Sequence, residues 1–180
     1  MRNLSIGAAM AAAFLTSTVS YAATMDAKPA GDAAPMMVVD TPTFLKVASG
    51  SNEFEIQSSN LAKEKASGAD VKELANMIVM DHTKAGEKLK ATLEAKNQPF
   101  TPSPPAPKQK RMLAQLQAAS GKEFDVLYLD IQAQAHMEAV ALFRTYAGSG
   151  DDQSVVGFAK ETLPRLETHL GHVVAIIKSQ

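Results

Sequence analysis

The sequence contains no cysteine and no tryptophan, and only 6% of its 180 residues are aromatic. Without cysteine there is no disulfide framework, no cysteine-ligated zinc site, no iron–sulfur cluster and no thiol nucleophile. An excess of one charge is also lacking, because 18 Lys and Arg face 19 Asp and Glu. This balance argues against a polybasic nucleic-acid binder, so no nucleic-acid partner is expected. The 46% of hydrophobic residues exclude an acidic disordered chain and are enough for one domain with a buried core.

Residues 1–22 have the pattern of a secretory signal peptide. Arg2 provides a charged start, an Ala-rich apolar run extends from Leu4 to Val19, and small residues precede a predicted cleavage site after Ala22. This run is shorter than the roughly 20 apolar residues that span a bilayer, and no later stretch is long and apolar enough. We therefore predict a periplasmic protein, exported through a cleaved signal peptide, with no transmembrane segment in the mature chain. Residues 23–40 are rich in Ala, Pro, Gly and Asp and are predicted to form a flexible linker.

From Thr41 onward, apolar residues recur at three- and four-residue intervals, which is the pattern of amphipathic helices. Thr41 and Pro42 are suited to the N-cap and the first turn of the first helix. Long helices are expected over residues 42–66, 69–96, 122–147 and 152–178, and a short one over 108–119. Five of the nine prolines lie between Asn97 and Pro107, which predicts an extended crossover. The expected fold is all-α: an antiparallel four-helix bundle over residues 41–180, with a Pro-rich crossover and a short extra helix between the second and third long helices.

Four polar residues occupy core positions of these helices: Glu55, His82, His136 and His169. Each is near the middle of a different long helix, and helix midpoints share one layer in an antiparallel bundle. One carboxylate and three imidazoles form a suitable ligand set for a single Zn, Cu or Fe ion. The alternative is a purely structural polar layer, in which Glu55 makes charge-assisted hydrogen bonds to imidazoles and fixes the helix register.

Three further residues are candidates for the same site. His172 is a spare ligand candidate but is expected at the rim, and Glu138 is expected to be exposed. Asp81 either orients an imidazole as an acceptor or is a solvated surface charge. Carboxylate-bridged di-iron sites need Glu-x-x-His on two helices, and the sequence has none, since Glu167 and His169 are one residue too close. Ferritin-type iron oxidation is therefore not expected.

Several short elements resemble one bacterial family. They are Asn52-Glu53-Phe54-Glu55, Met80-Asp81-His82-Thr83-Lys84-Ala85, Phe124-Asp125, Ala135-His136, Leu163-Pro164 and His169-Leu170. The chain is similar, from about Thr41 to Ile177, to domain of unknown function 4142 (DUF4142). This resemblance implies export and a ferritin-like four-helix bundle, and it implies no activity. The positions that match the family include Glu55, His82, His136 and His169.

Three functions are compatible with these observations. The first is a non-catalytic structural, interaction or stress-related protein of the cell envelope, with an envelope protein as its partner and a polar layer in its core. The second is a protein that binds one transition-metal ion (Zn, Cu or Fe) through Glu55, His82, His136 and His169. The third is a metal-dependent oxidoreductase, which would also need an open coordination position and access for a substrate. The sequence favours a protein without enzymatic activity and does not specify the oligomeric state.

Overall fold

The structure is a computed structural model that describes residues 39–180, and within this range the chain forms five helices and no strand. The helices are α1 (Thr41–Lys65), α2 (Ala69–Glu94), α3 (Pro107–Ala118), α4 (Gly121–Ser149) and α5 (Gln153–Ser179). The predicted all-α class is confirmed, and every helix begins and ends within two residues of its predicted limits. The predicted signal peptide, residues 1–22, and nearly all of the predicted linker fall outside the described residues.

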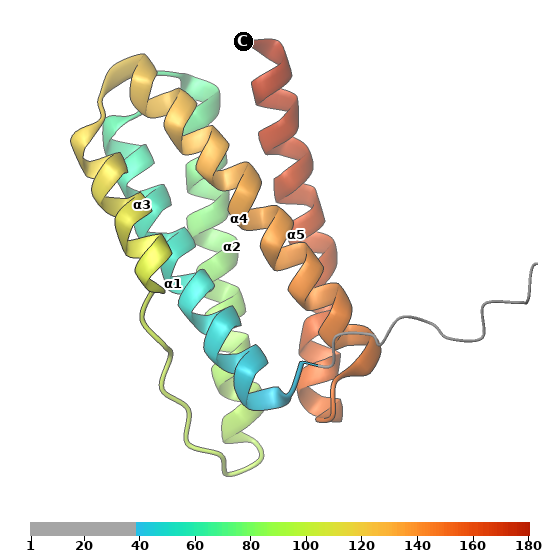
Figure 1. Ribbon diagram of the computed structural model, residues 1–180. Coiled ribbons are helices and arrows are strands. Elements are labelled where there is room, and N and C mark those ends of the chain that lie inside the picture. The colour runs from blue at the N-terminus through green and yellow to red at the C-terminus, as the bar shows by residue number, and fades with distance from the viewer. Residues whose placement is uncertain (1–38) are drawn as a thin grey trace, which may run out of the picture. The chain divides into compact units, whose positions relative to one another are not determined.

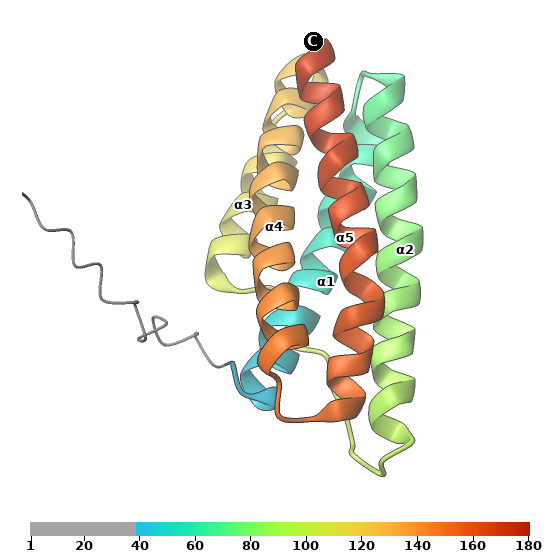
Figure 2. The same ribbon diagram turned by 90° about the vertical axis from the view of Figure 1, so that its right-hand side faces the viewer.

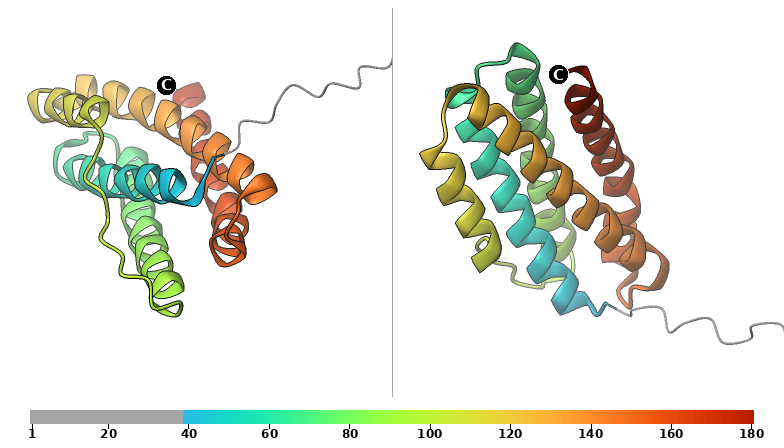
Figure 3. Two further views of the ribbon diagram at one scale, coloured as in Figure 1. Left: turned by 60° about the horizontal axis from the view of Figure 1, so that its bottom comes forward. Right: turned by 45° about the horizontal axis from the view of Figure 1, so that its top comes forward.

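The four long helices form two antiparallel hairpins, α1–α2 and α4–α5 (Figure 1). In the bundle, α1 packs against α2 and α4, and α5 packs against the same two helices. Figure 2 shows α5 lying between α4 and α2. The chain returns from the end of α2 through a crossover, residues 95–106, and through α3, which lies beside α1 and α4 (Figure 3). Two hairpins joined by one long crossover give the ferritin-like topology, in which all neighbouring long helices are antiparallel.

Two apolar clusters fill the bundle, one toward each end. The first includes Phe54, Ile78 and Phe124, and the second includes Phe44, Phe143 and Phe158. On α2, α4 and α5 the residues of the first and second clusters are separated by a short stretch that contains a buried polar side chain. Apolar packing on both sides therefore removes this middle layer from water, which makes its polar contacts energetically important.

The crossover lies directly against α1 at Gly50. A Cβ atom on this glycine would be only 2.9 Å from the carbonyl oxygen of Pro104. Beside it, the hydroxyl of Ser49 accepts a hydrogen bond of 3.0 Å from the backbone N–H of Ser103. The absence of a side chain at Gly50 thus allows the proline-rich crossover to approach a buried face of α1.

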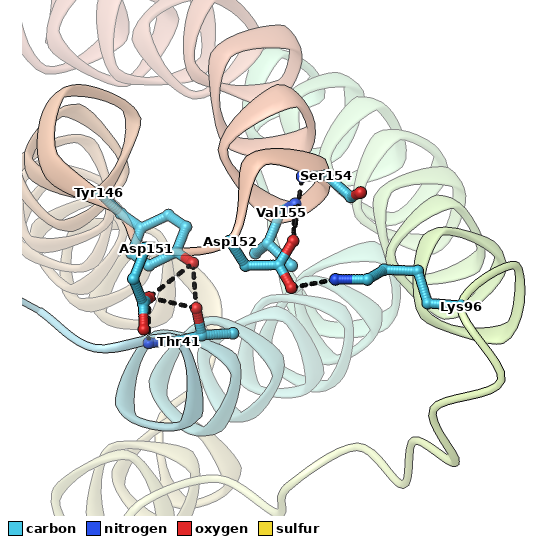
Figure 4. Close-up of polar contacts among 7 residues, drawn as sticks. All are labelled: Thr41, Lys96, Tyr146, Asp151, Asp152, Ser154 and Val155. Atoms are coloured by element: carbon cyan, nitrogen blue, oxygen red, sulfur yellow. Dashed lines mark hydrogen bonds and ion pairs between the residues drawn. The ribbon is translucent and has the colours of Figure 1, made fainter.

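Contacts between distant segments close the end of the bundle where α1 begins (Figure 4). The N-cap of α1 is Asp40, whose carboxylate accepts a hydrogen bond of 2.7 Å from the N–H of Thr43, so the predicted cap was wrong by one residue. The backbone N–H and the hydroxyl of Thr41 instead donate to Asp151, at 3.0 and 2.5 Å, and the Tyr146 hydroxyl also contacts the Thr41 hydroxyl. These contacts join the start of α1 to the α4–α5 turn.

Asp152 caps α5 at the same end of the molecule. Its carboxylate accepts hydrogen bonds from the N–H groups of Ser154 and Val155, at 3.0 and 3.3 Å, and forms an ion pair with Lys96 just after α2 (Figure 4). The hydrogen bond with Lys96 is the main reason that the pKa of Asp152 lies below its ordinary value. One side chain therefore stabilises a helix terminus and connects the two hairpins.

Candidate metal centre

Three of the four predicted polar residues come together in the middle layer of the bundle. His82 of α2, His136 of α4 and His169 of α5 are all buried, and the last two are fully inaccessible to solvent. Their ring centroids are 5.3–5.7 Å apart. One side-chain nitrogen from each lies within 4.8 Å of the corresponding nitrogens of the other two. Three helices thus bring imidazole nitrogens close together, although His82 and His169 are 87 residues apart in the sequence.

Each imidazole has one ring nitrogen in contact with an oxygen atom that can only accept a hydrogen bond. His82 donates from Nδ1 to the side-chain amide oxygen of Asn52 (3.1 Å), and His136 donates from Nδ1 to the backbone carbonyl of Gln132 (3.0 Å). His169 donates from Nε2 to Oδ2 of Asp81 (3.0 Å). Because these three nitrogens carry the protons, the tautomer of each neutral ring is fixed.

The remaining nitrogens, Nε2 of His82, Nε2 of His136 and Nδ1 of His169, therefore carry lone pairs. The nitrogens of His136 and His169 face each other at 3.3 Å. Nε2 of His82 is buried and has no hydrogen-bond partner among the described residues. Facing lone pairs are repulsive and an unpaired buried nitrogen is costly, so this arrangement is suited to an electron-pair acceptor placed between the rings.

Burial keeps all three rings in their neutral form. Burial and, to a smaller extent, the nearby His169 lower the pKa of His136 to about 4, against the opposing effect of the Gln132 carbonyl. The pKa of His82 is held well below its ordinary value by burial and then by His136 and His169. Burial also lowers the pKa of His169, against the opposing effect of the Asp81 carboxylate. Neutral imidazoles are the form that binds metal ions.

Glu55 of α1 lies beside the histidines but on the outer side of one of them. Its carboxyl oxygen Oε1 is 3.8 Å from Nδ1 of His136, the nitrogen that faces away from the cluster of lone pairs. Burial raises the pKa of Glu55 to about 8, although the Gln132 side chain opposes the shift, so the folded protein holds this carboxyl in its protonated form at neutral pH. Within residues 39–180, Oε2 of Glu55 and Oε1 of Gln132 are also buried without a hydrogen-bond partner, like Nε2 of His82. All three of these unpaired atoms therefore belong to the same layer.

The secondary candidates from the sequence lie in different environments. Asp81 does orient an imidazole, but it is His169 on the facing helix and not its neighbour His82. The same carboxylate oxygen is 3.5 Å from Nε of the exposed Arg165. His172 is exposed, and Glu138 is exposed and pairs with Lys108 on α3 at 2.6 Å.

Sequence reasoning assigned no role to Asn52 or Gln132. Gln132 is one helical turn before His136 on the same buried face, and its side-chain nitrogen donates to Ser58 on α1 (3.1 Å). Asn52 is one turn before Glu55. The signal for both was a polar amide three or four residues from a candidate site residue, which is the spacing that brings side chains together on a helix.

Comparison with known proteins places the chain in a family. The family described as "Domain of unknown function (DUF4142)" matches residues 26–176, which is most of the sequence. The chain belongs to the DUF4142 family. The suspected resemblance is thus confirmed, and DUF4142 itself has no assigned function. No curated protein matches the sequence.

A solved structure supports the fold of this DUF4142 protein. The similar chain is described as "putative secreted protein DUF305 from Streptomyces coelicolor", with a TM-score of 0.64 and 14% sequence identity. The likeness covers 76% of this chain and 89% of the other. At this identity the comparison shows a common helical fold and nothing about activity. None of the helices formed by residues 39–180 has the length and apolarity needed to cross a membrane.

Proposed function

We propose that this DUF4142 protein binds one transition-metal ion through His82, His136 and His169. The observation that carries the proposal is the fixed direction of the three lone pairs. Each ring donates its outer N–H to Asn52, Gln132 or Asp81, so each inner nitrogen is free to bind a metal. Metal-ligating histidines in proteins have this pattern of outer hydrogen bonds, which orients the ring and makes the inner nitrogen more basic.

The spacing of the nitrogens supports a metal ion. Zinc–imidazole bonds of about 2.0–2.1 Å in tetrahedral geometry separate the ligand nitrogens by about 3.3 Å. The facing nitrogens of His136 and His169 are 3.3 Å apart, and the three histidines can each offer one ring nitrogen within 4.8 Å of the other two. A proton shared by His136 and His169 would leave Nε2 of His82 unpaired, whereas one metal ion serves all three nitrogens. Imidazole ligands suit Zn, Cu and Fe.

Glu55 has a supporting role in this proposal. Its carboxyl group contacts the outer nitrogen of His136, so we assign the three histidines as ligands and place Glu55 behind one of them. This assignment differs from the four-ligand set suggested by the sequence. Three protein ligands leave a coordination position open, which is typical of sites that also bind an exogenous molecule.

Export to the periplasm is part of the same proposal. It is supported by the signal-peptide pattern of residues 1–22 and by the secreted character attributed to the Streptomyces coelicolor protein of similar fold. The proposed ligands are all imidazoles, so the site needs no cysteine thiol in that oxidising compartment.

The test is a metal titration of untagged, metal-free mature protein with Zn(II), Cu(II) and Fe(II), followed by mass spectrometry of the bound metal. We expect about one equivalent of metal in the wild type and loss of binding in H82A and H169A. H172A is the matched control, because His172 is an exposed histidine on the same helix as His169 and should leave binding unchanged. D81N should weaken binding by about 10- to 100-fold while all three ligands remain, and D130N, an exposed change on α4, should have no effect.

Two results would refute metal binding. One is a wild-type protein that stays folded and empty with all three metals. The other is equal loss of metal in H169A and H172A, which would indicate adventitious surface binding. In the first case the function favoured by the sequence stands instead: a non-catalytic envelope protein whose polar layer fixes helix pairing. Circular dichroism of each variant separates loss of a ligand from loss of the fold.

A further inference from the structure

A cavity adjoins the three histidines inside the bundle. Its volume is about 280 Å³, and it lies among α1, α2, α4, α5 and the crossover. His82, His136 and His169 line it, as does Glu55. The cavity also includes the exposed residues Glu87, Lys90 and Arg165 in its lining, so it extends from the buried histidines to the protein surface. A molecule that enters this cavity would therefore lie next to the proposed metal position.

The walls of this cavity are predominantly apolar. Leu89 of α2, Phe143 of α4, and Phe158 and Leu166 of α5 contribute to them, and Phe100 of the crossover contributes from the other side. A void of about 150 Å³ with such walls is large enough for benzene. The cavity next to the histidines thus has room for a substituted single ring or a short aliphatic chain, and its walls favour an apolar body.

At the histidine end of the cavity, the charge of the proposed metal ion favours an anionic group over an apolar one. Three neutral imidazoles would leave the charge of a divalent ion uncompensated in a buried site. Asp81 already accepts a hydrogen bond from His169 and pairs with Arg165. Glu55 lies behind His136. An anionic donor from outside the protein would balance this charge at the open coordination position.

We propose that the cavity binds a small monocarboxylate with an apolar body, whose carboxylate completes the coordination of the metal ion held by the three histidines. This inference rests on the proposed metal site. It assigns one ligand class: a cation is repelled by the metal, and a neutral apolar molecule leaves the metal charge unbalanced. A phosphate or sugar, which is polar on every side, leaves the apolar walls formed by Leu89, Phe143 and Phe158 without an apolar partner.

The test uses the mature protein loaded with Co(II), whose visible absorption reports changes in its ligands, and benzoate as the probe. We expect a saturable spectral change with benzoate. Benzamide, which lacks the charge, and acetate, which lacks the apolar body, should each require at least about tenfold higher concentrations. Metal-free protein should bind benzoate at least about tenfold more weakly than Co(II) protein in calorimetry.

A pair of variants checks that the cavity is the site. A139L adds three carbon atoms to the cavity wall one turn after His136, and it should weaken benzoate binding by about tenfold or more. A141L makes the same change at an exposed position of α4 and should not alter binding. The Co(II) spectrum without benzoate should be the same in both variants, which shows that the fold and the metal site are intact.

The outcomes distinguish the two proposals. If Co(II) gives no protein-bound spectrum, the metal site is refuted and the ligand class falls with it. If Co(II) binds but benzoate is no better than acetate or benzamide, the metal site stands and the ligand class is overturned. Equal benzoate affinities of A139L and A141L would likewise overturn the placement of the ligand in this cavity.

Discussion

Replacing Glu55 with glutamine removes the ionisable group buried in the middle of α1 while keeping nearly the same size and shape. Glu55 is 3% exposed, and burial raises the pKa of its carboxyl group from an ordinary value of 4.5 to about 8. Between these two pH values the folded protein holds a proton that the unfolded chain has released. The contribution of Glu55 to stability should therefore fall as the pH rises from about 5 to about 8, and this part of the pH dependence should be absent in E55Q.

The size of the effect follows from the two pKa values. Each pH unit between them changes the free energy of unfolding by about 1.4 kcal/mol. Near pH 5 the unfavourable contribution of Glu55 is below about 1 kcal/mol, and near pH 8 it reaches about 4 kcal/mol. E55Q should thus gain about 3 kcal/mol in unfolding free energy relative to wild type across this range. Any constant cost of burying the amide cancels in the comparison.

Urea denaturation of metal-free protein at several pH values between about 5 and 8 measures this difference. E64Q is the matched control, because Glu64 is an exposed glutamate on the same helix and its replacement should leave the pH dependence of the wild type unchanged. His136 acts in the opposite direction: its pKa is lowered to about 4, so its contribution is complete above its ordinary value of 6.5 and is lost as the pH falls below that value. That contribution is common to wild type and E55Q and also cancels.

A constant difference between E55Q and wild type from about pH 5 to about pH 8 would refute the argument. It would mean that Glu55 ionises in the folded state near its ordinary pKa, for instance with water or a cation beside Oε2. The layer would then be solvated, and the unpaired Nε2 of His82 would no longer require a metal ion.

Three further predictions concern the contacts that hold the layer in place, and each is measured by urea denaturation. G50A should lower the free energy of unfolding by about 1–2 kcal/mol, because the new Cβ meets the Pro104 carbonyl at 2.9 Å. G157A in α5, where a new Cβ would have no neighbouring atom within 4 Å, should raise it by about 0.5–1 kcal/mol. Equal effects of the two substitutions would contradict the close approach of the crossover. D125A should lower the free energy of unfolding by about 2–3 kcal/mol. The reason is that the buried Asp125 carboxylate accepts hydrogen bonds from the N–H groups of Ser67 (3.0 Å) and Gly68 (2.9 Å) in the α1–α2 turn. A decrease below about 0.5 kcal/mol would show that this turn does not depend on these hydrogen bonds. D152A should cost about 1 kcal/mol through loss of the α5 cap, while D152N, which keeps a capping side chain and loses only the ion pair with Lys96, should cost a few tenths. Because both variants lose the ion pair, equal costs would assign the stability to the ion pair and not to the cap.

Most of the fold could be predicted from local sequence. The apolar spacing of a helix is set by its own geometry, and Gly121, the Ser67–Gly68 pair and the five prolines between Asn97 and Pro107 interrupt that spacing where helices end or begin. The cap of α1 is an instructive exception. Thr41 has the residue type of an N-cap, but its hydroxyl is engaged by Asp151 and Tyr146 more than a hundred residues away, and Asp40 caps the helix instead.

The sequence by itself determined that three histidines would share one layer, because position along a helix and the face of a helix both follow from residue number. Only the tertiary structure decided which nitrogen of each ring is free. That depends on the atoms opposite each ring: the Asn52 amide on α1, the Gln132 carbonyl within α4, and Asp81, which lies beside His82 in sequence but reaches across to His169. The tertiary structure also decided that Glu55 lies behind His136. A rotation of one helix about its axis moves a side chain from the centre of a layer to its edge without changing its height. Packing between helices alone fixes that rotation.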